Sequence, residues 1–180
     1  MGMHIALLRG VNVGGNRKIP MADLRAALTK AGLANTRTLL HSGNVVFEGS
    51  RRSGAALERW LEAETVARVG VAAEYMVRTP AEWRAMIAAN PFRAEASDTP
   101  ALLHAFLCKE PPTAAQIKAL KAAIPGREKM AAGSHHLYVY YPDGAGESRL
   151  NAALLDRLVG SATARNWNTV LKLAAMVLDS

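Results

Sequence analysis

The sequence has one cysteine, few aromatic residues and no long apolar run. Cys108 on its own excludes a disulfide within the chain and a cysteine zinc cluster, and the apolar run 101–108 around it is typical of a buried thiol. The five histidines lack the spacing of metal ligands, so no metal is expected. No apolar stretch follows a basic N-terminal region or approaches the length of a membrane span, so we expect a cytoplasmic protein with no membrane partner.

Acidic residues are also fewer than basic ones. Asp and Glu number 15 against 22 Lys and Arg, which gives a formal net charge of +7 and an isoelectric point of about 9.9. Such an excess attracts an anionic small molecule or nucleic acid, although a solvated basic surface has the same composition. Aromatic residues are only 6% of the chain, and no strand-like segment carries the paired aromatics of an RNA-recognition sheet.

Hydrophobic patterning in the first half predicts an α+β unit over residues 1–79. Strands are expected at 4–9, 37–41, 44–48 and 72–78, and helices at 20–31 and 56–69. The order strand, helix, strand, strand, helix, strand is the split βαβ, or ferredoxin-like, arrangement. At this length the chain accommodates either one domain or two small subdomains, as a monomer or homodimer.

The second half repeats this order incompletely. A capping helix from Pro80 and a polar connection are expected over 80–100, followed by a second half over 101–180. Strands are expected at 102–107, 128–132 and 137–141, with helices after Thr113 and around Leu154. The closing strand is missing from the pattern, and a helix from Trp167 stands in its place. The expected fold is therefore α+β with two tandem ferredoxin-like halves, the second degenerate and closed by a C-terminal helix.

A loop rich in glycine, asparagine and cations joins the first expected strand to the first expected helix. Backbone N–H groups and side-chain charge in such a loop suit an anion. Neither a Walker A sequence nor G-x-G-x-x-G is present, so an ATPase loop and a dinucleotide fingerprint are not indicated. The alternative is that this segment only connects the strand to the helix, with glycines that allow the chain to turn sharply. The predicted ligand-binding residues are Arg9, Asn12, Gly14, Gly15, Asn16, Arg17 and Lys18, joined by Asn44, Arg165 and Asn168 if the fold brings them near.

Two further polar clusters have simpler interpretations. His41 and Ser42 are adjacent, so in a strand they point to opposite faces, and residues 42–44 are predicted to form a hairpin turn. Residues 163–169 contain candidate helix caps beside Trp167, and their polar side chains could equally form the wall of a ligand site or a surface network. No residue is predicted to be catalytic.

Taken together, five segments resemble a known bacterial family, catalogued as domain of unknown function 1697. They are LRGVNVGGNRKIPM at 8–21, SGNVVF at 42–47, RT at 78–79, NPF at 90–92 and RNWNT at 165–169. The resemblance runs nearly end to end and implies an α+β fold of two ferredoxin-like halves, without implying an activity or cofactor. His41 stands where the family often has Gln, and Arg149 where Lys is usual.

Three functions are compatible with these observations. The first is binding of a phosphate-containing anion at the N-terminal loop, and the second is an enzyme that acts on a phosphorylated small molecule in the same place. The third is a structural or interaction protein whose polar motifs only fix loops.

Overall fold

The computed structural model describes residues 2–15 and 17–178, which form two compact units. The first unit comprises the described residues of Met1–Arg84 and Leu173–Ser180, and the second comprises Ala85–Lys172. Each unit contains one four-stranded antiparallel sheet, so the chain is an α+β protein.

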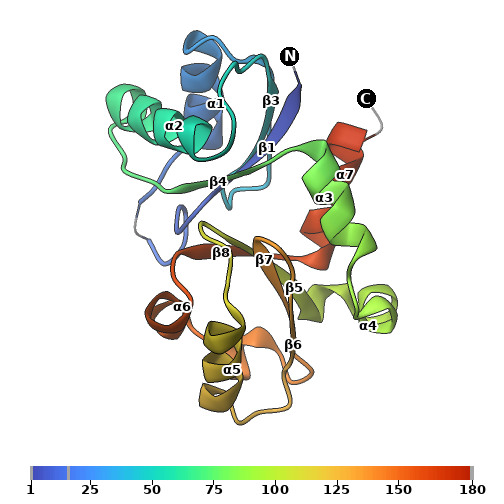
Figure 1. Ribbon diagram of the computed structural model, residues 1–180. Helices are drawn as coiled ribbons and strands as arrows, with labels where there is room; N and C mark the ends of the chain where they lie inside the picture. The colour runs from blue at the N-terminus through green and yellow to red at the C-terminus, as the bar shows by residue number, and fades with distance from the viewer. Residues whose placement is uncertain (1, 16, 179–180) are drawn as a thin grey trace. The chain divides into compact units, whose positions relative to one another are not determined.

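In the first unit, the elements follow the predicted order strand, helix, strand, strand, helix, strand, and α1 and α2 cover one face of the sheet (Figure 1). The strand order across the sheet is β2-β3-β1-β4. The elements are β1 (Met3–Leu8), α1 (Met21–Lys30), β2 (Ala34–Leu39), β3 (Asn44–Glu48), α2 (Gly54–Val69), β4 (Tyr75–Arg78) and the start of α3 (Pro80–Ala88).

The core of the first unit lies between this sheet and its two helices. Leu24 and Leu28 on α1, and Leu57 and Leu61 on α2, are four residues apart and fully buried, because i and i+4 share one helix face. Tyr75 closes the core from β4. Its hydroxyl lies 2.7 Å from the Thr65 hydroxyl, so this buried polar group is satisfied.

The second unit has the strand order β6-β7-β5-β8, again with two helices, α5 and α6, between strands of one sheet. Its core joins apolar residues of the strands to α5 and α6. The elements are the end of α3, α4 (Arg93–Asp98), the 3-10 turn η1 (Pro100–Leu102), β5 (Leu103–Cys108), α5 (Ala114–Ala123), β6 (Lys129–Ala132), β7 (His136–Tyr140), η2 (Ala145–Glu147), α6 (Ala152–Leu158), β8 (Ala162–Asn166) and the start of α7 (Trp167–Leu178).

The prediction that the second half is degenerate and lacks its closing strand is wrong. β8 (Ala162–Asn166) pairs antiparallel with β5, from His104 opposite Asn166 to Cys108 opposite Ala162. Its sequence, ATARN, has one β-branched residue and little apolar alternation, so its strand conformation depends on pairing with β5 rather than on local preference. The C-terminal helix α7 follows this strand and does not replace it. The expected connection before β5 also contains the short helix α4.

Within residues 2–15 and 17–178, no helix combines the length and apolar content that a membrane crossing requires. The same residues contain no group of three or more His, Cys, Asp or Glu side chains placed to hold a metal ion.

Candidate functional site

The N-terminal loop between β1 and α1 is organised around the side chain of Asn12. Its Nδ2 donates to the carbonyl oxygens of Ile19, at 2.9 Å, and His41, at 2.7 Å, while its Oδ1 accepts from the Ile19 N–H at 2.8 Å. One amide therefore ties the two arms of the loop together and joins them to the turn between β2 and β3. The Asn12 side chain thus holds the two loops in place, and its contact with a ligand stays a prediction.

Left-handed backbone conformations gather in the same two loops. Among the described residues, non-glycine positive φ angles occur at Asn12 (57°), Arg17 (49°), Asn35 (49°) and Leu40 (59°), and all but Asn35 belong to the N-terminal loop or the β2–β3 turn. Each left-handed residue costs about 1–2 kcal/mol relative to the ordinary conformation. Such costs are concentrated at functional sites in proteins generally, where the surrounding structure holds the backbone in place.

A pocket of about 370 Å³ opens where these two loops meet. It is lined by Asn12, Gly15, Lys18, Ile19, Pro20 and His41, all from the first unit. The pocket lies at the start of α1, whose N-cap residue Pro20 supplies no side-chain hydrogen bond to the first turn. The N-terminus of a helix carries a partial positive charge, which adds to the charge of the neighbouring cations.

The cations of the loop differ in their availability. Arg17 and Lys18 are exposed, and Lys18 lines the pocket. Arg9 instead lies with Nη1 3.2 Å from Glu74 Oε2, and its backbone N–H donates to the Glu74 carbonyl oxygen at 2.9 Å. Arg9 therefore fixes the start of the loop to the segment before β4.

The glycines and Asn44 shape the site. Gly14 and Gly15 have φ of 62° and 80°, and Gly15 lines the pocket. Asn16 lies outside the described residues. Asn44 is fully buried, and its Nδ2 donates to the Leu39 carbonyl oxygen at 2.8 Å and the Ser42 hydroxyl at 3.0 Å. These bonds stabilise the predicted hairpin turn, which β2 and β3 confirm by pairing on either side of it.

Arg165 and Asn168 belong to the second unit and are not among the residues that line this pocket. Arg165 is buried, with Nη1 donating to the Thr163 hydroxyl at 2.7 Å and the Ala164 carbonyl oxygen at 2.8 Å. Burial lowers the pKa of its guanidinium to about 10, which still leaves it charged at neutral pH. Asn168 is exposed on the first turn of α7, and of the two candidate caps, Thr163 and Asn166, it is Asn166 whose Oδ1 accepts from the Thr169 N–H at 3.1 Å.

Sequence reasoning missed three residues that line the pocket. The sequence predicts His41 only as the end of a strand, Pro20 only as the start of a helix, and Ile19 only as part of the family motif, whereas all three line the pocket. The signal that could have placed His41 there is the family motif on both sides of it, because two motif loops in one split βαβ unit can meet at one end of the sheet. The hydrogen bond from the Asn12 side chain to the His41 carbonyl oxygen joins the two loops directly.

Comparison with known proteins gives a family and a fold. A family model described as "Protein of unknown function (DUF1697)" matches residues 1–138. The chain is similar to the solved structure of a conserved bacterial protein from Streptococcus pneumoniae, with 24% sequence identity, a TM-score of 0.75 and coverage of 97% of this chain and 98% of that one. No curated protein matches the sequence. The family match covers well over half of the 180 residues. The chain therefore belongs to the DUF1697 family.

Proposed function

We propose that the protein binds a small anionic, phosphate-containing ligand in the pocket between the N-terminal loop and the β2–β3 turn. The observation that carries the proposal is the convergence at one place of an open pocket, the exposed cation Lys18 and a helix start without a side-chain cap. The cation and the helix start each favour an anion and together supply charge and N–H donors, while the pocket provides the space for it.

The two loops are fixed in place by hydrogen bonds, which supports the same proposal. Asn12, Arg17 and Leu40 have left-handed backbones, and the hydrogen bonds of Asn12 keep the loops together. A loop that only connects a strand to a helix has no need of this arrangement, whereas a preformed anion site does, because preorganisation lowers the cost of binding.

Size and local charge define the ligand further. A volume of about 370 Å³ falls at the lower end of small-molecule sites, which suits a phosphorylated metabolite better than a folded nucleic acid. Asp23 in the first turn of α1 contributes one negative charge, so an anion depends on Arg17 and Lys18 to outweigh it. The apolar sides of Ile19 and Pro20 give the remainder of the ligand a surface to contact.

The proposal extends to the setting of the site. We assign each unit to the ferredoxin-like class, on the basis of its split βαβ order and its strand order. A cytoplasmic location is proposed as well, since phosphorylated metabolites are made and used mainly in the cytoplasm and the sequence has a single cysteine, Cys108.

A thermal-shift screen with inorganic phosphate, nucleotides, sugar phosphates and short oligonucleotides tests the proposal. A ligand at about 100 times its Kd adds about 2.7 kcal/mol to the free energy of unfolding, which raises Tm measurably. The variant Lys18→Glu should abolish the shift, whereas Lys30→Glu, an equal charge change at the other end of α1, should preserve it. An unshifted Tm with every anion, or equal loss in both variants, would contradict the proposal.

Turnover separates binding from catalysis. Incubation of the wild-type protein with each shifting ligand, followed by phosphate release and product analysis, is expected to show binding without conversion. Conversion that Lys18→Glu abolishes would instead make the site an enzyme active site.

A further inference from the structure

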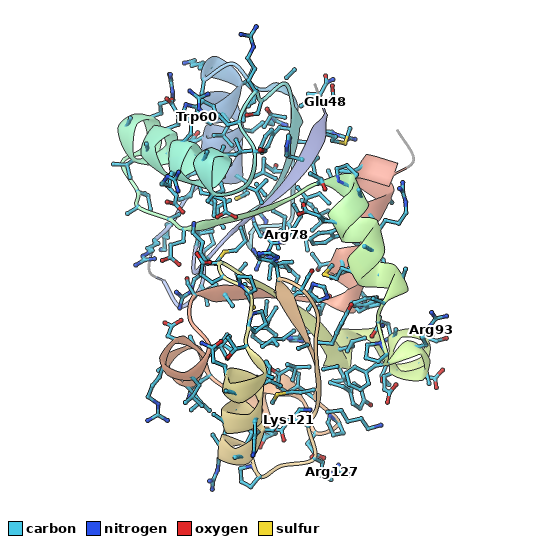
Figure 2. The ribbon with its side chains drawn as sticks, viewed as in Figure 1. Glu48, Trp60, Arg78, Arg93, Lys121 and Arg127 are labelled. Atoms are coloured by element: carbon cyan, nitrogen blue, oxygen red, sulfur yellow. The ribbon has the colours of Figure 1, made fainter. Side chains whose placement is uncertain are left out.

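A second pocket, of about 560 Å³, lies in the second unit between α5 and β6. It is lined by Ala114, Ile117, Lys118 and Lys121 of α5 and by Ala132 of β6, and we call it the α5–β6 groove. Residues 114, 117, 118 and 121 fall at i, i+3, i+4 and i+7, so they share one helix face. Lys121 on α5 is labelled in Figure 2.

The floor of the groove is a strand at the end of its sheet. β6 pairs with β7 and is terminal in the order β6-β7-β5-β8. The Gly133 N–H donates to the His136 carbonyl oxygen at 2.8 Å, which makes these two residues a hydrogen-bonded pair in the register that sets Ala132 opposite Leu137. Such pairs alternate along an antiparallel ladder. The N–H and C=O groups of Ala132 and Met130 therefore point away from β7, toward the open edge.

The charge of the groove has one sign. Lys118 and Lys121 are exposed, and neither forms an ion pair with any residue in the described part of the chain. Ile117, which is 8% exposed, and the small side chains of Ala114 and Ala132 leave an apolar strip beneath the two ammonium groups. An occupant that fits this surface combines an aliphatic side chain with carboxylates.

The equivalent edge of the first unit is occupied differently. There α1 packs along β2, and Arg37 Nη2 of β2 donates to the Met176 carbonyl oxygen of α7 at 2.6 Å. Beside β6, the second unit has the α5–β6 groove, and the Lys129 side chain of β6 donates to Glu95 Oε1 of α4 at 2.7 Å. The helix after the first strand thus packs along the edge strand in the first unit, whereas a groove lies between that helix and the edge strand in the second.

We propose that an extended acidic segment of a partner protein binds in the α5–β6 groove by adding a strand to β6. Its backbone pairs with the outward groups of Met130 and Ala132, as in β-strand addition generally. Alternate residues of a strand face the same side and repeat every ~6.6 Å, close to the rise of ~6 Å over four helical residues from Ile117 to Lys121. An aliphatic residue can therefore contact Ile117 while the acidic residue two positions along meets Lys118 and Lys121.

A designed peptide tests this surface independently of the anion pocket in the first unit. The probe is fluorescein-labelled Ser-Val-Thr-Glu-Thr-Glu-Ser, which places Val and both Glu residues on one side of a strand, and the matched control has Lys for Glu. Fluorescence anisotropy with the full-length protein should show saturable binding of the acidic probe alone. Lys118→Glu with Lys121→Glu should weaken it by at least about tenfold, whereas Lys30→Glu with Arg59→Glu, an equal charge change on exposed residues of α1 and α2, should not.

A backbone variant distinguishes strand addition from simple charge attraction. Because the Ala132 N–H faces outward, Ala132→Pro removes a donor that an added strand needs without removing a bond between β6 and β7. This variant should keep its fold by circular dichroism and lose probe binding. Hydrogen exchange in the wild-type complex should slow at the amides of Met130 and Ala132.

Three results would overturn the proposal. The first is no saturable binding of the acidic probe at low salt, and the second is unchanged binding by Ala132→Pro. The third is concentration-dependent dimerisation in analytical ultracentrifugation that Ala132→Pro abolishes and the probe does not reduce, because it would assign the groove to a second copy of the chain.

Discussion

Replacement of Gly43 by alanine tests whether the turn and the N-terminal loop fit together as closely as the structure shows. Gly43 lies in the β2–β3 turn with φ of +80°, and its carbonyl oxygen accepts from the Leu8 N–H at 2.8 Å. A Cβ atom at this position would lie 2.7 Å from Val11 Cγ2 and 2.8 Å from Leu8 Cβ. Leu8 and Val11 are 0% and 1% exposed, so neither can move into solvent.

Two costs add in the Gly43→Ala variant. The positive φ costs an alanine about 1–2 kcal/mol, and forcing one methyl group into a filled core costs about 1–3 kcal/mol. We therefore expect the free energy of unfolding to fall by about 3 kcal/mol. Gly70→Ala is the matched control, because φ is +76° there and no atom lies within 4 Å of the added Cβ, so only the conformational cost applies.

Urea unfolding followed by circular dichroism measures both variants. With an m value of about 2–3 kcal/mol per molar, Gly43→Ala should lower the unfolding midpoint by about 1 M or more, and Gly70→Ala by about half as much. Because both substitutions restrict the unfolded chain equally, the difference between the variants isolates the contacts with Val11 and Leu8. Equal midpoints for Gly43→Ala and Gly70→Ala would refute the reasoning.

Two further predictions concern buried polar groups. Burial lowers the pKa of His4 and His104 below the unfolded value of 6.5. Near that pH the unfolded chain therefore binds protons that the folded chain does not, so the free energy of unfolding should be highest above pH 7 and should fall as the pH drops through 6.5. Unfolding midpoints in urea at pH 7.5 and 5.5 measure this loss of stability. The loss should be smaller in the double variant His4→Phe, His104→Phe, and an equal loss in that variant would show that other groups cause it. The Tyr138 hydroxyl donates to the Met86 carbonyl oxygen at 2.6 Å, so Tyr138→Phe should lower the free energy of unfolding by about 1–2 kcal/mol. Tyr140→Phe, at a partly exposed hydroxyl, should cost less, and the reverse order of midpoints would contradict the assignment.

Regular local patterns made most of the fold predictable. Thr79 and Thr113 stand three residues before Glu82 and Gln116, a spacing that predicts a capping box, and both pairs form the reciprocal hydrogen bonds of that motif. β8 was missed because its residues show no strand pattern, and only β5 across the sheet stabilises it as a strand. Pairing between segments about 60 positions apart is not encoded in the local periodicity of either one.

The candidate site was predictable in its composition and less so in its geometry. The cations and glycines of the loop marked the region, but the roles of its polar residues depend on long-range contacts. Arg9 is fixed by Glu74, and Asn12 by Ile19 and the His41 carbonyl oxygen. Those partners lie 7 to 65 positions away, so sequence alone could not distinguish a residue that faces the pocket from one that supports it.

The division of the chain has a consequence for its synthesis. The second unit is one continuous stretch, Ala85–Lys172, whereas the first also uses residues from Leu173 onward, where the Met176 carbonyl oxygen accepts from Arg37. A ribosome makes proteins from the N-terminus, so every residue of the second unit has been joined before the first unit has its full set. The first unit is thus encoded first and completed last. Its edge strand β2 gains the hydrogen bond to α7 only after the whole second unit has been synthesised.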